Sequence, residues 1–131
     1  MSKLNSKRNQ AGHIEFYDEA GDLAKIQYTT GTTAFFKDGD LHRDGGPAVM
    51  DPNNETWYQH GIIHRVSGPA MIYFEFGAPV QQFWIQNGVR HRTDGPAIEH
   101  LGTERKEFDC YFINGQLLTK EEFDAWRLEN C

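Results

Sequence analysis

The sequence is poor in cysteine, and this argues against a disulfide-based scaffold. Among 131 residues there are two cysteines, Cys110 and Cys131. Small secreted scaffolds are usually held by several disulfide bridges. We therefore expect both thiols to be free, as in a reducing cytoplasm.

Long apolar runs and an excess of basic residues are also lacking. No stretch approaches the roughly 20 apolar residues that span a bilayer, and the polar start of the chain is not typical of a signal peptide. The net charge is −6, with acidic and basic residues mixed along the chain, whereas nucleic-acid binders usually present a basic stripe. The sequence therefore predicts a cytoplasmic protein with no membrane partner and no general nucleic-acid binding.

Glycine and aromatic residues, in contrast, are abundant. The chain holds 13 glycines, nine phenylalanines, five tyrosines and three tryptophans. Aromatic side chains suit the half-buried surface of a sheet, and glycines suit tight turns. This composition favours an all-β fold.

Three segments share one pattern, which we call the HRxxGPA unit. It consists of an aromatic residue, three residues, Gly, two residues, His-Arg, two residues and Gly-Pro-Ala, and it spans residues 35–48, 57–70 and 84–97. A fourth copy, residues 111–118, keeps the aromatic residue and the glycine and then departs from the pattern. The residues that we expect to maintain the repeated structure are Gly39, Gly61, Gly88, Gly115, His42, His64, His91, Pro47, Pro69 and Pro96.

The units predict tandem antiparallel hairpins. Asn87-Gly88 and Asn114-Gly115 are dipeptides that type I′ hairpin turns favour, and helical spacing of apolar residues is absent from this region. The expected fold is an open, elongated antiparallel meander. The predicted organisation is a disordered tail over 1–12, an N-terminal hairpin cap over 13–34, the hairpin repeats over 35–118 and a C-terminal capping helix over 119–131.

A short helix is expected at the C-terminus. Thr119 and Glu122 have the spacing of a capping box, and Leu118 and Phe123 that of a hydrophobic staple. The helix is predicted over about residues 120–128, where its apolar face would cover the end of the sheet.

The tight turn followed by HRxxGPA resembles MORN-like and antitoxin-type β-hairpin repeats, particularly the variant found in small phage and giant-virus proteins. The resemblance covers roughly residues 35–118. It implies stacked hairpins that bind partners and carry no chemistry of their own. A phage-encoded protein of this kind would act in the host-cell cytoplasm.

Two sets of residues are candidates for binding. The arginines of the three units would form a row of donors for an anionic ligand such as a nucleotide or phosphate, or each would serve the fold of its own unit. Phe35, Trp57, Trp84 and Tyr111 are expected to stack in the core, and their neighbours to project from the opposite face as an exposed aromatic patch. The candidate binding residues are Arg43, Arg65, Arg92, Tyr58, Phe83 and Phe112, with Phe36 beside them.

No catalytic residue, metal ligand or cofactor is predicted. The histidines lack the closely spaced partners of a zinc site. His42-Arg43-Asp44 imitates the catalytic loop of protein kinases, but none of the other kinase motifs accompanies it. We therefore expect a non-enzymatic protein-binding module, a modulator or antitoxin-like inhibitor of a host protein. Capture of a small anionic ligand and homodimerisation are the alternatives.

Overall fold

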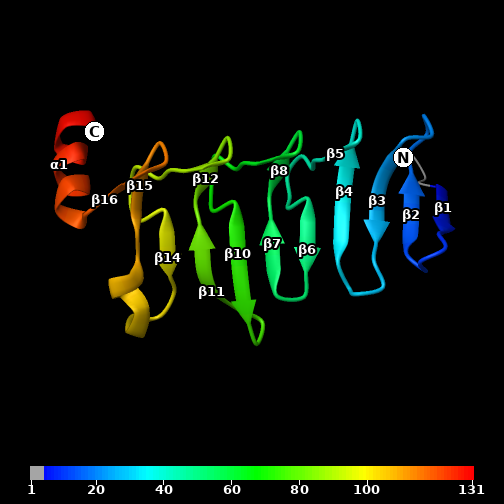
Figure 1. The fold of residues 1–131 in the computed structure, drawn as a ribbon, viewed down its shortest axis with the longest axis horizontal. Helices are drawn as coiled ribbons and strands as arrows, with labels where there is room; N and C mark the ends of the chain where they lie inside the picture. The colour runs from blue at the N-terminus through cyan, green and yellow to red at the C-terminus, as the bar shows by residue number, and fades with distance from the viewer. Residues whose placement is uncertain (1–4) are drawn as a thin grey trace.

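The chain forms one open antiparallel sheet with a helix at its C-terminal end (Figure 1). The structure, a computed structural model, describes residues 5–131, apart from the side chains of residues 103 and 104. In spatial order, the strands of the main sheet are β1 (Asn5–Arg8), β2 (Ile14–Tyr17), β3 (Leu23–Gln27), β4 (Thr33–Lys37), β6 (Val49–Asp51), β7 (Asn54–Thr56), β10 (Met71–Glu75), β11 (Ala78–Phe83) and β14 (Ile98–His100). The predicted all-β, elongated meander is confirmed.

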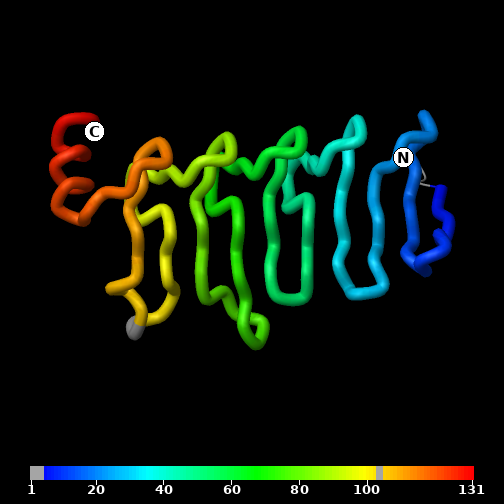
Figure 2. The backbone as a smooth tube through the Cα atoms, viewed as in Figure 1, coloured from blue at the N-terminus to red at the C-terminus, as the bar shows by residue number. Residues whose placement is uncertain are grey.

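Four short hairpins lie side by side along one edge of this sheet, as the backbone trace shows (Figure 2). They are formed by β4 with β5 (Asp40–Leu41), β8 (Tyr58–Gln59) with β9 (Ile62–Ile63), β12 (Ile85–Gln86) with β13 (Val89–Arg90), and β15 (Tyr111–Ile113) with β16 (Gln116–Leu118). Both central residues of each turn have positive φ, for example 51° at Asn87 and 79° at Gly88. These are the type I′ turns that the Asn-Gly dipeptides predict.

Each tight turn after the first is hydrogen-bonded to the hairpin before it. The backbone N–H of the turn glycine donates to a carbonyl of the preceding short hairpin, so consecutive hairpins are held in a fixed register. The N···O distances are 2.8 Å from Gly61 to Leu41, 2.9 Å from Gly88 to Ile63 and 2.8 Å from Gly115 to Arg90.

The alanine of each Gly-Pro-Ala segment directly precedes a strand of the main sheet, β6, β10 or β14. Ala48, Ala70 and Ala97 have no exposed surface at all. The carbonyl of each alanine accepts a 2.7 Å hydrogen bond from the backbone N–H of a unit's aromatic residue. A larger side chain at these close-packed positions would force the strands apart.

A disordered tail was expected over 1–12, of which residues 1–4 lie outside the described residues. Residues 5–8 instead form β1, which pairs with β2. The connecting turn is held by Asn9, whose Oδ1 accepts the backbone N–H groups of Ala11 and His13 at 3.0 and 3.1 Å. Asp18 holds the next turn in the same way. The segments Asn9-Gln10-Ala11-Gly12 and Asp18-Glu19-Ala20-Gly21 are alike, and this likeness was the signal for the extra strand.

The C-terminal helix α1 (Lys120–Asn130) forms where the capping box predicts it. The N–H of Glu122 donates to Thr119 Oγ1 at 3.1 Å, and the N–H of Thr119 donates to Glu122 Oε1 at 2.8 Å. Phe123 is 2% exposed, and its ring centroid lies 4.8 Å from that of Tyr111. The helix thus covers the last hairpin. Neither α1 nor any other helix of the described residues combines the length and apolar character needed to cross a membrane.

Replacing Phe123 by alanine is expected to lower the free energy of unfolding by about 3–5 kcal/mol, because it opens a cavity under the helix. Chemical denaturation followed by circular dichroism measures this loss. Leu128, on the same helix and 87% exposed, is the matched control, and Leu128→Ala should leave stability nearly unchanged. Equal effects of the two substitutions would contradict the capping role of Phe123.

Candidate functional site

The recurring arginines stack on the recurring aromatic rings. A guanidinium group over a ring at this separation makes a favourable cation–π contact. The Cζ atom lies 4.0 Å from the ring centroid for Arg43 over Phe35, 3.7 Å for Arg65 over Trp57 and 4.0 Å for Arg92 over Trp84. Phe35, Trp57 and Trp84 thus each face the arginine of their own unit and not a neighbouring ring, as the expected ladder would require.

The glycine of each Gly-Pro-Ala segment lies against the other side of the guanidinium group. A Cβ atom placed on Gly46, Gly68 or Gly95 would lie 3.0, 2.8 or 2.9 Å from the Cζ atom of the arginine in that unit. None of these three glycines has positive φ, so glycine is required here by close packing and not by backbone conformation. Each guanidinium group is held between a ring and a glycine.

The same guanidinium groups also bond to the backbone. In every unit Nη1 donates to the proline carbonyl of Gly-Pro-Ala, at 3.2 Å from Arg43 to Pro47, 3.1 Å from Arg65 to Pro69 and 3.1 Å from Arg92 to Pro96. Each guanidinium group thus has a ring on one face, a glycine on the other and a hydrogen bond to a carbonyl. All of these contacts lie within the arginine's own unit, which they stabilise. The geometry gives no support to a row of arginines that captures an anion.

The histidines connect each unit to the next. Their Nδ1 atoms accept the backbone N–H of the first turn residue in the following unit, so these nitrogens carry no proton. The N···N distances are 2.9 Å from His60 to His42, 2.8 Å from Asn87 to His64 and 2.9 Å from Asn114 to His91. His13 accepts the N–H of Thr29 in the same way, at 3.1 Å, a contact that the repeat pattern does not include.

The opposite face of the sheet is apolar. Strand pairing places one residue from each central strand in a lateral row, and residues two positions further along a strand lie on the same face. The row is formed by Ile26, Ala34, Val49, Thr56, Met71, Phe83 and Ile98. The second row on this face holds Phe36, Tyr58, Ile85 and Phe112. Phe83 therefore shares a face with Tyr58 and Phe112, as expected, but lies one row away, and Ile85 takes the equivalent position.

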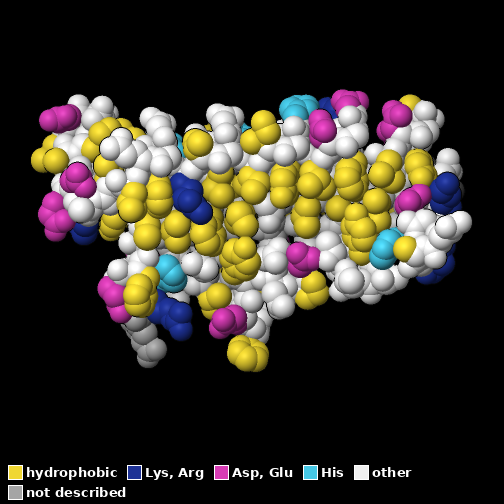
Figure 3. Space-filling model, in the orientation of Figure 1, with side chains coloured by type: hydrophobic (Ala, Val, Ile, Leu, Met, Phe, Trp, Pro, Cys, Tyr) yellow, Lys and Arg dark blue, Asp and Glu magenta, His cyan; other side chains and the backbone are white. Residues whose placement is uncertain are grey.

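These two rows form a continuous strip of hydrophobic side chains along the molecule (Figure 3). We call it the apolar band and define it as Ile26, Phe36, Val49, Tyr58, Met71, Phe83, Ile85, Ile98, Phe112 and Leu117. Leu117 is the cross-strand partner of Phe112 and is 61% exposed. Ile85 is buried, and the other members are partly exposed. Near the middle, the band is hollowed by a cavity of about 390 Å³ lined in part by Ile63, Met71 and Ile85. No described element packs over it as a second layer.

Comparisons of the chain with family models, curated proteins and solved structures find no match. Among the described residues, no group of three or more His, Cys, Asp and Glu side chains is arranged to hold a metal ion. The strongest candidate for a functional surface is therefore the apolar band.

Replacing Gly68 by alanine is expected to lower the free energy of unfolding by about 1–3 kcal/mol, because the new methyl group meets the Arg65 guanidinium group. In the Arg65→Ala background the clash is absent, and Gly68→Ala should then be nearly neutral or slightly stabilising. Denaturant titration of the wild type, both single variants and the double variant measures this coupling. An equal cost of Gly68→Ala in both backgrounds would show that arginine packing is not the reason for glycine.

A second prediction concerns Arg65, whose Nε is buried without a hydrogen-bond partner. Burial lowers the pKa of this guanidinium group, and the charge of Glu55 opposes the shift. In the next unit, Arg92 Nε donates to Asp94 at 2.9 Å, and Ser67 occupies the position equivalent to Asp94. We expect Ser67→Asp to supply the missing acceptor and to stabilise the fold by about 0.5 kcal/mol.

The reciprocal variant, Asp94→Ser, removes the acceptor from Arg92 and should cost about the same amount. Thermal unfolding at low and high salt measures both effects, which screening should weaken. A destabilised Ser67→Asp variant would contradict the equivalence of the two positions.

Proposed function

We propose that this chain is a non-enzymatic repeat module that binds a protein partner through the apolar band. The observation that carries this proposal is the band itself, which runs along one face of a single-layer sheet (Figure 3). Soluble monomers rarely leave a large contiguous apolar patch in water, and such patches commonly mark interaction sites.

The contacts of the recurring arginines and histidines support a non-catalytic role. Each arginine is used by a ring and a carbonyl of its own unit, and each histidine of the repeat is used by the next turn. Side chains that hold the scaffold in this way are not free to act on a substrate. The partner would lay an elongated apolar surface along the band, anchored by aromatic side chains such as Tyr58 and Phe112.

The resemblance to MORN-like and antitoxin-type repeats supports a more specific proposal. The protein would act in the cytoplasm as a modulator or inhibitor of a host protein, encoded by a phage. An elongated sheet suits this role, because it can cover a long surface of its target without a large conformational change.

The triple variant Tyr58→Ser, Phe112→Ser and Leu117→Ser tests the band directly. After affinity capture of the partner from the native cell, binding of the purified pair is measured by biolayer interferometry. Loss of three apolar contacts should weaken the complex by at least about tenfold, which corresponds to about 1.4 kcal/mol. The circular dichroism spectrum should remain that of the wild type.

Phe76 provides the matched control, because it is fully exposed in the β10–β11 turn, outside the band. Phe76→Ser should bind the partner as the wild type does. Equal binding by the wild type and the triple variant would refute the band as the interface. Wild-type self-association in sedimentation analysis, abolished in the triple variant, would instead assign the band to a homodimer.

A further inference from the structure

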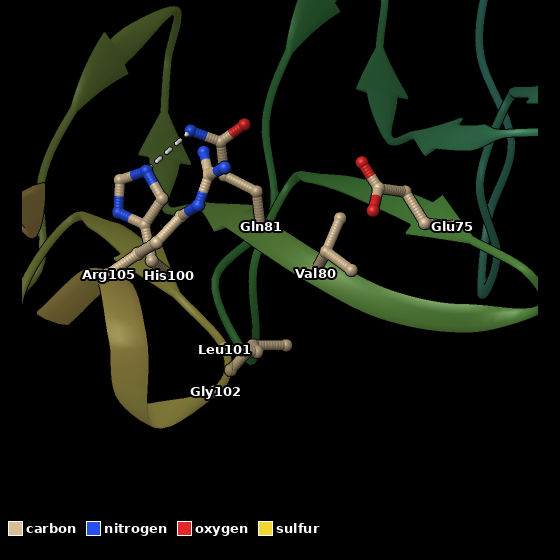
Figure 4. Close-up of a pocket in the computed structure, with 7 residues that line it drawn as sticks. All are labelled: Glu75, Val80, Gln81, His100, Leu101, Gly102 and Arg105. Atoms are coloured by element: carbon tan, nitrogen blue, oxygen red, sulfur yellow. Dashed lines mark hydrogen bonds between the residues drawn. The ribbon is translucent and has the colours of Figure 1, made fainter.

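A second hollow lies where the repeat pattern breaks. It has a volume of about 480 Å³ and lies between β11, β14 and the 3₁₀ helix η1 (Thr103–Phe108). Figure 4 shows the residues that line it: Glu75, Val80, Gln81, His100, Leu101, Gly102 and Arg105. The size is that of a small-molecule site.

One wall of this hollow has no equivalent in the other units. The connections from β6 to β7 and from β10 to β11 are tight turns, over Asp51–Asn54 and Glu75–Ala78. The corresponding connection from β14 to β15 is longer, because it includes η1 and returns to the sheet at the Ile98–Cys110 bridge. This longer connection brings Arg105 to the hollow.

A chain of hydrogen bonds orients the amide of Gln81. Asp109 Oδ1 lies 3.1 Å from His100 Nδ1 and accepts the backbone N–H of His100 at 2.6 Å. Because a carboxylate only accepts, Nδ1 of His100 donates to it. Gln81 Nε2 is an amide nitrogen, which only donates, and it lies 3.1 Å from His100 Nε2. Gln81 Oε1 has no hydrogen-bond partner among the described residues and can accept from a ligand.

The charged groups of the hollow stand apart. Arg105 lies with His100 and Gln81 at one side, and Glu75 lies at the other side, beyond the apolar Val80 (Figure 4). Neither Arg105 nor Glu75 forms an ion pair with any residue whose side chain is described. A ligand that satisfies both ends must carry an anionic group and a cationic group, joined by an apolar segment.

We propose that this hollow binds a small amino carboxylate. Its carboxylate pairs with the guanidinium group of Arg105, which matches carboxylate geometry. Its ammonium group donates to the carboxylate of Glu75 and to Gln81 Oε1, because this oxygen points from the Arg105 side toward Glu75 (Figure 4). Val80 and Leu101 contact the methylene segment. Asp109 and His100 are positioning residues, which hold the amide of Gln81 in the accepting orientation.

The test is a titration of the full chain with 5-aminopentanoate, followed by ¹H–¹⁵N and methyl NMR. Pentanoate and pentylamine, which each lack one charged group, are the matched ligands. We expect saturable shifts at Val80, Gln81 and Leu101 with 5-aminopentanoate, and at least about tenfold weaker binding of either analogue, because one charged hydrogen-bonded contact is missing.

Variants separate the two ends of the site. Arg105→Gln should reduce the affinity for 5-aminopentanoate to that of pentylamine, and Glu75→Gln should reduce it to that of pentanoate. Gln81→Leu should weaken 5-aminopentanoate and leave pentanoate unchanged. Arg127→Gln, which removes an exposed arginine of α1, is the control and should bind as the wild type does.

Three results would overturn the assignment. The first is the absence of saturable shifts with every ω-amino carboxylate from glycine to 6-aminohexanoate. The second is equal affinity for 5-aminopentanoate and its two analogues. The third is wild-type affinity in both Arg105→Gln and Glu75→Gln. These readouts do not involve the apolar band, so they are independent of the proposed protein partner.

Discussion

The docking of each tight turn on the hairpin before it holds this scaffold together. In a type I′ turn both central residues have positive φ, and here their two N–H groups both bond to the preceding unit. In the second unit, His60 N–H bonds to His42 Nδ1 and Gly61 N–H bonds to the carbonyl of Leu41. The turn dipeptide and the histidine of the motif thus act together, and each unit is hydrogen-bonded directly to its neighbour.

This arrangement leads to a division between the two faces of the sheet. On one face, the guanidinium group of Arg65 fills the space between Trp57 and Gly68. Arg43 and Arg92 do the same in their own units. The polar and aromatic groups of the motif therefore contact one another within the unit. The other face carries the alternate residues of the same strands, and no recurring arginine of the motif covers it; Arg90 lies over Phe112, with its Cζ 5.5 Å from the ring centroid. An exposed apolar face is therefore a consequence of how the motif stabilises itself.

The sequence predicts the features that depend on local rules. The Asn-Gly turns, the capping box at Thr119 and the meander follow from residue types at fixed spacing. Strand β1 was missed because its residues are polar and exposed, and its only sequence signal is the turn at Asn9. The partners of the arginines and histidines lie across strands or in the next unit, so their geometry needed the three-dimensional arrangement. The hollow beside His100 was missed because it belongs to no repeat.

The fourth copy shows which residues of the motif contact the preceding unit and which contact the following unit. It keeps its aromatic residue and its turn, because Asn114 still donates to His91 of the unit before it. It lacks His-Arg. The helix α1 follows it, and Phe123 contacts the ring of Tyr111 where the other units have an arginine. Residues that recur thus serve contacts within a unit or between neighbouring units. Residues that occur in one unit alone, such as Arg105 and Asp109, are not needed for the stacking of units, and this is why they are the better candidates for a specific ligand.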